Sequence, residues 1–185
     1  MKNVARLGVI ASVLIGCALL AAGLLWRSLS PEKLSDVEAA VRKSFPEVRQ
    51  MSTGELSAEL SDPKRPPVVL IDVRSQDEFD VSHLQGARLV DPETDPAFAL
   101  SDVAPDAEVV VYCSVGWRSS KYARKLQSNQ FKNVYNLEGS IFKWANEGRP
   151  VFNAVQKVQT VHPYDRVWGR LLLPQYRADK TTPEN

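Results

Sequence analysis

The segment EVVVYCSVGWRSS, residues 108–120, passes from an apolar run through a short loop into a polar stretch. Three consecutive valines, Val109–Val111, predict a strand that is covered on both faces, as in a parallel sheet. The residues that follow, SSKYARKLQSNQF (119–131), predict an amphipathic helix. Cys113, Gly116 and Arg118 stand between strand and helix. A cysteine that only packed in a core would not need a glycine and an arginine directly after it, so the loop itself indicates a functional site.

Outward from this segment, short apolar runs and helical patterns alternate along the chain. Strands are expected at 48–51, 68–71, 86–90, 108–113 and 133–138, and helices at 30–45, 52–60, 75–84, 119–131 and 139–148. Residues 91–108 are rich in Pro and Asp and are expected to be a surface loop. The alternation predicts an α/β fold with a central, mostly parallel sheet flanked by helices on both faces.

Two of these helices carry recognisable start signals. Ser30 is expected to cap the first, with Pro31 at its first position, and the apolar residues of that helix recur at helical spacing. These residues are Leu34, Val37, Val41 and Phe45. The helix is interpreted as a spacer laid against the domain, with a partner-binding helix as the alternative. Ser52 and Glu55 form a capping-box pattern at the start of the second helix.

The charge balance argues against one large class of partner. The chain has 185 residues, with 23 Lys and Arg against 22 Asp and Glu. Without a basic excess, binding to the phosphate backbone of nucleic acids is not expected. Its two cysteines are Cys17 and Cys113, and Cys17 lies inside an apolar run, so no disulfide framework is expected.

Residues Leu7–Trp26 are 20 consecutive residues without a charge, about the number that a helix needs to span a bilayer. Three interpretations remain open: a retained membrane anchor, which fits the length best; a cleaved secretory signal; and a lipoprotein signal in which Cys17 is lipidated. Lys2 and Arg6 precede the segment and weakly favour an inside amino terminus. The expectation is a transmembrane helix with the soluble domain on the extracytoplasmic (periplasmic) side.

The Cys113 loop offers both a nucleophile and an anion site. A loop this short can direct successive amide N–H groups to one point, and Gly116 permits the backbone angles required. The helix that follows, expected from about Ser119, points its positive end there, and Arg118 adds a permanent cation. Such surroundings lower a thiol pKa from about 8.5 toward roughly 3.5–7.5. We therefore expect Cys113 to be an activated sulfur beside a pocket for an anion.

This loop resembles the active-site loop of rhodanese-type sulfurtransferases, in which a catalytic cysteine opens a six-residue loop that an arginine closes. Two further segments agree: LIDVRSQDEFDVSHLQGARLV (70–90) and NLEGSIFKWANEGRPV (136–151) are similar to motifs on either side of that loop in the family. The resemblance covers roughly 47–151. It implies domain boundaries of 1–27 for the anchor or signal, 28–46 for the spacer helix, 47–151 for a rhodanese-like domain and 152–185 for a C-terminal extension.

The resemblance also implies a reaction and a set of site residues. Cys113 is expected to be catalytic, taking a sulfur atom from a small anionic donor such as thiosulfate and passing it to a thiol or, in the test tube, to cyanide. The expected substrate-binding residues are those of the loop: Ser114, Val115, Gly116, Trp117, Arg118 and Ser119. No metal or organic cofactor is needed for this chemistry.

Four further polar residues are expected to support the loops. They are Asp72, Arg74, Glu78 and His83, with Glu78 as the partner of Arg74. The chain departs from the family pattern where Ser82 and Ser140 stand in place of glycines. Both are small-for-small changes in turns and are expected to leave the Cys113 loop untouched.

Two other functions are alternatives to sulfur transfer. Related phosphatase loops have five residues between Cys and Arg, whereas four separate Cys113 from Arg118 here. A non-catalytic sulfur carrier, sensor or protein-binding module is the second alternative. The tail after residue 158 contains Trp168, Leu171–Leu173 and Tyr176, so it is expected to pack on the domain, with contact to a partner or membrane surface as the alternative; His162 is assigned no chemistry.

Overall fold

A parallel sheet of five strands forms the centre of the fold in the computed structural model, which describes residues 33–179. The strands are β1 (Arg49–Met51), β2 (Val69–Asp72), β3 (Arg88–Leu89), β4 (Glu108–Tyr112) and β5 (Asn133–Leu137). Their order is β1-β5-β4-β2-β3, and each neighbouring pair is parallel. The predicted parallel sheet is confirmed.

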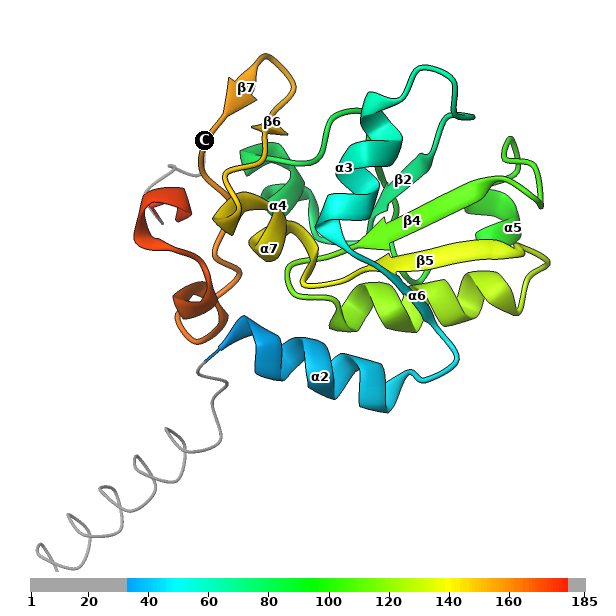
Figure 1. Cartoon of the computed structure of the whole chain (residues 1–185), viewed down its shortest axis with the longest axis horizontal. Helices are drawn as coiled ribbons and strands as arrows, with labels where there is room; N and C mark the ends of the chain where they lie inside the picture. The colour runs from blue at the N-terminus through cyan, green and yellow to red at the C-terminus, as the bar shows by residue number, and fades with distance from the viewer. Residues whose placement is uncertain (1–32, 180–185) are drawn as a thin grey trace, which may run out of the picture. The chain divides into compact units, whose positions relative to one another are not determined.

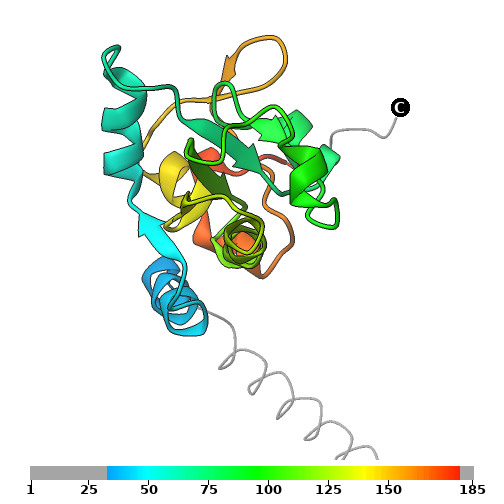
Figure 2. The ribbon, with the colours of Figure 1, turned by 90° about the vertical axis from the view of Figure 1, so that its right-hand side faces the viewer.

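Helices cover both faces of this sheet, as predicted (Figures 1 and 2). They are α2 (Leu34–Ser44), α3 (Thr53–Ser61), α4 (Gln76–Val81), α5 (Pro96–Ala99), α6 (Trp117–Gln127) and α7 (Ser140–Asn146). The connections from β1 through α3 to β2 and from β4 through α6 to β5 cross the sheet in opposite directions. Because such crossovers are right-handed, α3 and α6 lie on opposite faces. Figure 1 shows α2 on the same side as α6.

The position of β4 at the centre of the sheet explains why it contains three consecutive valines. Val109, Val110, Val111 and Tyr112 are all 0% exposed, because β2 and β5 flank the strand and side chains cover both faces. Fully burying a valine-sized side chain stabilises the fold by roughly 1.5–3 kcal/mol. A strand of this kind needs no polar face, so its sequence shows no alternation.

The first described helix begins later than predicted. Lys33 is extended (φ −131°, ψ 146°) and is the N-cap of α2, so this helix starts at Leu34. Ser30, the predicted cap, and Pro31, the predicted first helical position, lie outside the described residues. Val37, Val41 and Phe45 are buried, in agreement with the predicted apolar stripe. The predicted capping box of α3 is present, with both Ser52 and Glu55 side chains bonded to backbone N–H groups.

The segment 91–108 is not entirely loop. A short helix, α5, begins after Asp95, whose carboxylate accepts a hydrogen bond from Ala97 N–H at 2.8 Å. Pro96 at the first helical position has no N–H to satisfy, which suits this start. The prediction missed the helix because its four residues are too few to show a periodic pattern.

The C-terminal residues pack on the domain, as expected. They follow the antiparallel pair β6 (Val151–Phe152) and β7 (Lys157–Val158) and include the 3₁₀ helices η1 (Trp168–Leu171) and η2 (Pro174–Tyr176), drawn in orange and red in Figure 1. Asn146 of α7 donates to Leu171 O at 2.7 Å and accepts from Leu173 N–H at 2.8 Å. Leu171 and Leu172 are buried. The segment is therefore part of the core.

Within residues 33–179, no helix combines the length and apolarity needed to span a membrane. The predicted membrane segment, Leu7–Trp26, and Cys17 within it lie outside the described residues.

Candidate catalytic site at the end of strand β4

Cys113 follows β4 at the carboxyl edge of the sheet, where parallel α/β folds bind ligands. Gly116 adopts a left-handed conformation (φ 107°) and is the N-cap of α6. The helix consequently begins at Trp117, two residues before the predicted start at Ser119. Trp117 and Arg118, expected in the loop, belong to the first helical turn.

The sulfur of Cys113 is surrounded by donors. The Gly116 N–H donates to Sγ at 3.2 Å, and the Ser119 hydroxyl lies 3.4 Å from it. Burial raises the pKa of the Cys113 thiol, but the charge of Arg118 and the hydrogen bonds from Ser119 and Gly116 lower it by more. The net effect is a pKa below the ordinary value for cysteine. This balance favours a thiolate although Cys113 is 1% exposed.

Gly116 cannot readily be replaced. A Cβ atom at this position would lie 3.3 Å from Asn136 Nδ2, and a φ of 107° is strained for any residue with a side chain. The backbone of Val115 is part of the loop, but its side chain is 6% exposed and belongs to the core. Val115 can therefore contribute to a bound substrate through its main chain and not through its side chain.

Arg118 and Glu78 form the main ion pair of the site. Arg118 Nη1 donates to Glu78 Oε2 at 2.9 Å and Nη2 to Oε1 at 2.8 Å, while the Ser114 hydroxyl donates to Oε1 at 2.8 Å. Burial raises the pKa of Glu78, but these bonds and the Arg118 charge lower it to about 2. The predicted pairing of Glu78 with Arg74 is therefore wrong: Glu78 holds the cation of the Cys113 loop.

Arg74 instead pairs with Asp72. Arg74 Nε and Nη2 donate to the Asp72 carboxylate at 2.9 and 2.7 Å, and Nη2 also donates to Ser82 O at 2.6 Å. Both side chains are 0% exposed. Burial lowers the pKa of Arg74, but the Asp72 charge and hydrogen bond raise it above its ordinary value. The pair fixes the turn after β2 and stays charged.

His83 is held by backbone and ring contacts. Its Nδ1 lies 2.9 Å from Phe79 O, and its ring stacks on Phe79 with centroids 3.8 Å apart. Its main chain exchanges two hydrogen bonds with Phe152. Ser82, one of the two departures from the family pattern, is extended (φ −172°), a conformation open to any residue. These contacts serve the loop between α4 and β3.

Ser140, the other departure, does touch the Cys113 loop, contrary to prediction. Its hydroxyl accepts from Cys113 N–H at 3.2 Å and donates to Leu137 O at 3.1 Å. The first turn of α7 adds two bonds, because Ile141 N–H and Phe142 N–H donate to the carbonyls of Cys113 and Ser114. The amino end of α7 therefore holds the loop from behind.

Three residues near the site were missed from the sequence. Asn136 Oδ1 of β5 accepts a hydrogen bond from the Ser119 hydroxyl at 2.6 Å. The centre of the Tyr164 ring lies 4.8 Å from the Arg118 guanidinium carbon. The rings of Phe45 and Trp117 meet edge to face, with their centroids 5.4 Å apart. A polar Asn136 within an otherwise strand-like segment was an available signal. The other two contacts depend on the tertiary arrangement and have no local signature.

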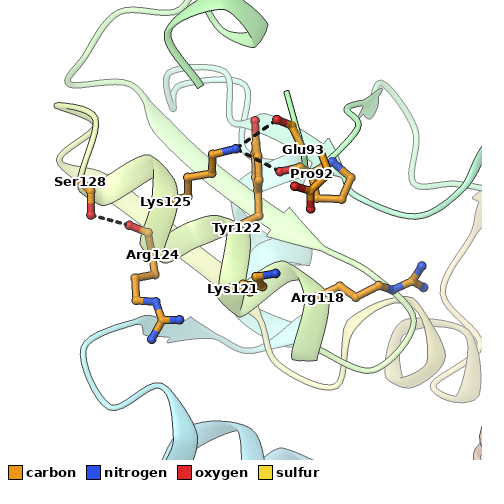
Figure 3. A pocket seen from close by; sticks show the side chains of 8 residues that line it. All are labelled: Pro92, Glu93, Arg118, Lys121, Tyr122, Arg124, Lys125 and Ser128. Atoms are coloured by element: carbon orange, nitrogen blue, oxygen red, sulfur yellow. Dashed lines mark hydrogen bonds between the residues drawn. The ribbon is translucent and has the colours of Figure 1, made fainter. Parts of the chain in front are cut away.

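A cavity of about 440 Å³ lies beside the site, along α6 (Figure 3). Its lining comprises Pro92, Glu93, Arg118, Lys121, Tyr122, Arg124, Lys125 and Ser128. Figure 3 shows the Lys125 ammonium directed at the loop that holds Pro92 and Glu93, where it donates to both of their carbonyl oxygens. It also donates to Thr94 O. Arg118 belongs both to this cavity and to the Cys113 site. Among residues 33–179, no three His, Cys, Asp or Glu side chains gather as a metal site would require.

The sequence profile of the rhodanese-like domain family matches residues 52–147, more than half of the chain. The chain belongs to the rhodanese-like family. The matched range includes the Cys113 loop, Glu78, Asn136 and Ser140, so the contacts described above lie within the rhodanese-like domain.

Two curated relatives match the part of the chain that contains the rhodanese-like domain. A tRNA uridine(34) hydroxylase of Pectobacterium carotovorum subsp. carotovorum (strain PC1) is 33% identical over 89 residues, 45% of this chain and 25% of that protein. An uncharacterized protein of Bacillus subtilis (strain 168) is 35% identical over 78 residues, 42% of this chain and 61% of that protein. The chain thus spans about a quarter of the hydroxylase's length. The activity in the hydroxylase's name belongs to a much longer protein.

A solved structure agrees on the fold. The rhodanese-like domain of an Anabaena sp. protein, determined in solution, is similar with a TM-score of 0.52 at 24% identity. The match covers 57% of this chain and 80% of that domain. At this identity the likeness bears on the fold alone.

Proposed function

We propose that the protein is a sulfurtransferase that carries a sulfane sulfur as a persulfide on Cys113. The observation that carries the proposal is the set of donors around Sγ, with the Gly116 N–H at 3.2 Å and the Ser119 hydroxyl at 3.4 Å. A thiolate and a persulfide anion both need such donors, which supply the electrostatic part of covalent catalysis. Arg118, held by Glu78, supports the same negative charge.

The reaction consists of two displacements. The Cys113 thiolate attacks the outer sulfur of thiosulfate; a new S–S bond forms, the old one breaks, and sulfite leaves with the bonding electron pair. An acceptor thiolate then attacks the outer sulfur of the persulfide and releases Cys113 as a thiolate. No external oxidant or reductant is consumed, because each step exchanges one S–S bond for another.

Intact-mass measurement after incubation with thiosulfate tests this function. We expect one added sulfur atom, located on Cys113 and removed by cyanide or a thiol. Cys113→Ser should add none, whereas Lys64→Gln, at an exposed position in the loop between α3 and β2, should behave like wild type. A wild-type protein that gains no sulfur under these conditions would rule the proposal out.

The pH dependence of loading gives a second check. Because the surroundings of Cys113 lower its thiol pKa, the thiolate persists to lower pH than for free cysteine. The loading rate should fall at a pH below the value of about 8.5 for an unperturbed thiol. A rate that follows an ordinary thiol titration would show that the donors do not act on the sulfur.

Other outcomes of these assays would support the alternatives. Loading without transfer to any thiol or cyanide would indicate a sulfur carrier or sensor. Hydrolysis of a phosphate monoester would indicate a phosphatase, which the four-residue spacing of Cys113 and Arg118 does not favour. The name of the hydroxylase relatives raises a role in tRNA modification, although the chain has no basic excess that favours RNA binding.

We also propose that Leu7–Trp26 anchors the protein in a membrane, with the rhodanese-like domain on the extracytoplasmic side. The proposal rests on the uncharged length of the segment and the cations that precede it. Alkaline carbonate washing should leave the protein in the membrane fraction, and protease added outside spheroplasts should digest the domain. Release into the wash would refute the anchor, and protection from the protease would refute the orientation.

A further inference from the structure

A one-way chain of hydrogen bonds runs from Cys113 into the sheet. The Ser119 hydroxyl lies 3.4 Å from Cys113 Sγ and 2.6 Å from Asn136 Oδ1. Asn136 Nδ2 donates to Gln50 Oε1 at 2.7 Å, and Gln50 Nε2 donates to Val48 O at 3.1 Å. Ser119 and Asn136 are both 0% exposed, so water does not take the place of these partners.

The direction of the chain is fixed at its far end. A backbone carbonyl such as Val48 O can only accept, so Gln50 must present its amide NH₂ to it and its Oε1 to Asn136. Asn136 must then turn its NH₂ toward Gln50 and its Oδ1 toward Ser119. Because Gln50 and Asn136 are register partners in β1 and β5, the sheet holds them side by side.

Ser119 has one hydroxyl proton and two acceptors that compete for it. When Cys113 is a thiol, its S–H can donate to Ser119 Oγ while Ser119 donates to Asn136. When Cys113 is a thiolate, the same proton is needed at the sulfur, and Asn136 loses its bond. We propose that Asn136 is a positioning residue that draws the Ser119 proton away from the sulfur and so opposes formation of the Cys113 thiolate.

Other groups around the sulfur act in the opposite sense or through the backbone. Arg118 of α6 is the charged side chain that acts directly on the Cys113 thiol, and Glu78 of α4 holds it in place. Ser140 of α7 accepts from the Cys113 N–H, and Tyr164 of the C-terminal segment lies over Arg118. None of these shares the Ser119 proton, so the contribution of Asn136 can be separated from theirs.

The inference rests on the proposed role of Cys113 as a nucleophile, and it adds a group that limits how readily this nucleophile forms. The donors around Sγ activate the sulfur, whereas the Asn136 chain limits the fraction of thiolate in the unloaded protein. Removing the Ser119 hydroxyl, which donates to the sulfur, and removing Asn136, which competes for that proton, should therefore have opposite effects on the pKa of the Cys113 thiol. A purely structural role of Asn136 would not give this pattern.

The test is an ultraviolet titration of the thiolate in the full chain, corrected with Cys113→Ser for Cys17 and the tyrosines. Ser119→Ala should raise the Cys113 pKa by about one unit, the order of one hydrogen bond to a charged group. Asn136→Leu, which removes the acceptor, should lower the pKa by about half a unit to one unit. Because Asn136 acts through Ser119, the double variant should match Ser119→Ala alone.

Gln50→Leu provides a second variant that leaves Ser119 and Asn136 in place. Without Gln50, the Asn136 amide can turn its NH₂ toward Ser119, which frees the Ser119 proton for the sulfur, so the thiol pKa should again fall. This variant carries the test if Asn136→Leu does not fold. An unchanged or raised pKa in both variants, or an Asn136→Leu shift that persists with Ser119→Ala, would overturn the inference. Since the readout is a titration, its result is independent of whether sulfur transfer occurs.

Discussion

Ser140 occupies a left-handed backbone conformation (φ 52°) that costs a residue with a side chain of order 1–3 kcal/mol. Its hydroxyl offsets this cost, since it accepts from Cys113 N–H and donates to Leu137 O. Ser140→Ala keeps the strain and loses both bonds, and should destabilise the protein by about 2 kcal/mol. Ser140→Gly loses the bonds but relieves the strain. Urea unfolding should therefore rank Ser140→Gly above Ser140→Ala; the reverse order would contradict the role of the hydroxyl.

Glu78 has a lowered carboxyl pKa that makes its charge matter for acid stability. Its pKa is about 2 in the folded protein against an ordinary value of 4.5. The folded value is the lower one, so the carboxylate stabilises the fold above pH 4.5, and this contribution is lost as the pH falls toward 2. Glu78→Gln should cost about 2 kcal/mol at neutral pH, below the roughly 3–5 kcal/mol of a fully buried pair.

Unfolding in urea at several pH values checks the Glu78 prediction. The difference in free energy of unfolding between wild type and Glu78→Gln should shrink as the pH falls from 4.5 toward 2. Glu59→Gln is the matched control, because Glu59 pairs with Arg65 at the surface, where such a pair contributes about 0–1 kcal/mol. A difference that does not depend on pH would mean that the loss is one of packing and not of charge.

At the scale of elements, periodic patterns predicted most of the secondary structure. The valine run gave β4, and the capping box at Ser52 gave α3, because both signals are local. The start of α6 was misplaced because Gly116 acts as its N-cap through its left-handed backbone, which no side-chain pattern reveals. The partner of Glu78 was also wrong, since Arg118 is 40 residues away and only the fold brings the two together.

The packing of helix α2 against α6 can be tested by a substitution at Phe45. Phe45, just after the helix, is 6% exposed and meets the ring of Trp117, so it joins α2 to the first turn of α6. Phe45→Ala should destabilise the protein by about 3 kcal/mol, as buried aromatic truncations do. Phe98→Ala, at a position 79% exposed, should change stability by less than about 0.5 kcal/mol. Equal unfolding midpoints for the two variants would show that α2 is not docked.

At the scale of the whole molecule, the rhodanese-like match ends at residue 147, whereas the core does not. Val161, Leu171 and Leu172 are buried after that point, and Tyr164 reaches Arg118 at the site. Composition predicted that this segment packs on the domain, since it is too apolar for a free linker. Its contact with the site could not be predicted, because it depends on the path of the chain across the carboxyl edge of the sheet.

Two adjacent leucines test whether the C-terminal segment is part of the cooperative fold. Leu172 is 1% exposed and Leu173 is 43% exposed, although the two residues are adjacent, and neither substitution removes the backbone hydrogen bond from Leu173 N–H to Asn146 Oδ1. Leu172→Ala should cost about 2–5 kcal/mol, because it leaves a cavity in the core. Leu173→Ala should cost less than about 0.5 kcal/mol.

Both costs can be measured by thermal unfolding of the full chain. If residues 159–179 fold together with the sheet, each variant should show a single unfolding transition, shifted to lower temperature in Leu172→Ala alone. If the segment unfolded separately, Leu172→Ala would instead show an additional early transition, and the temperature of the main transition would not change.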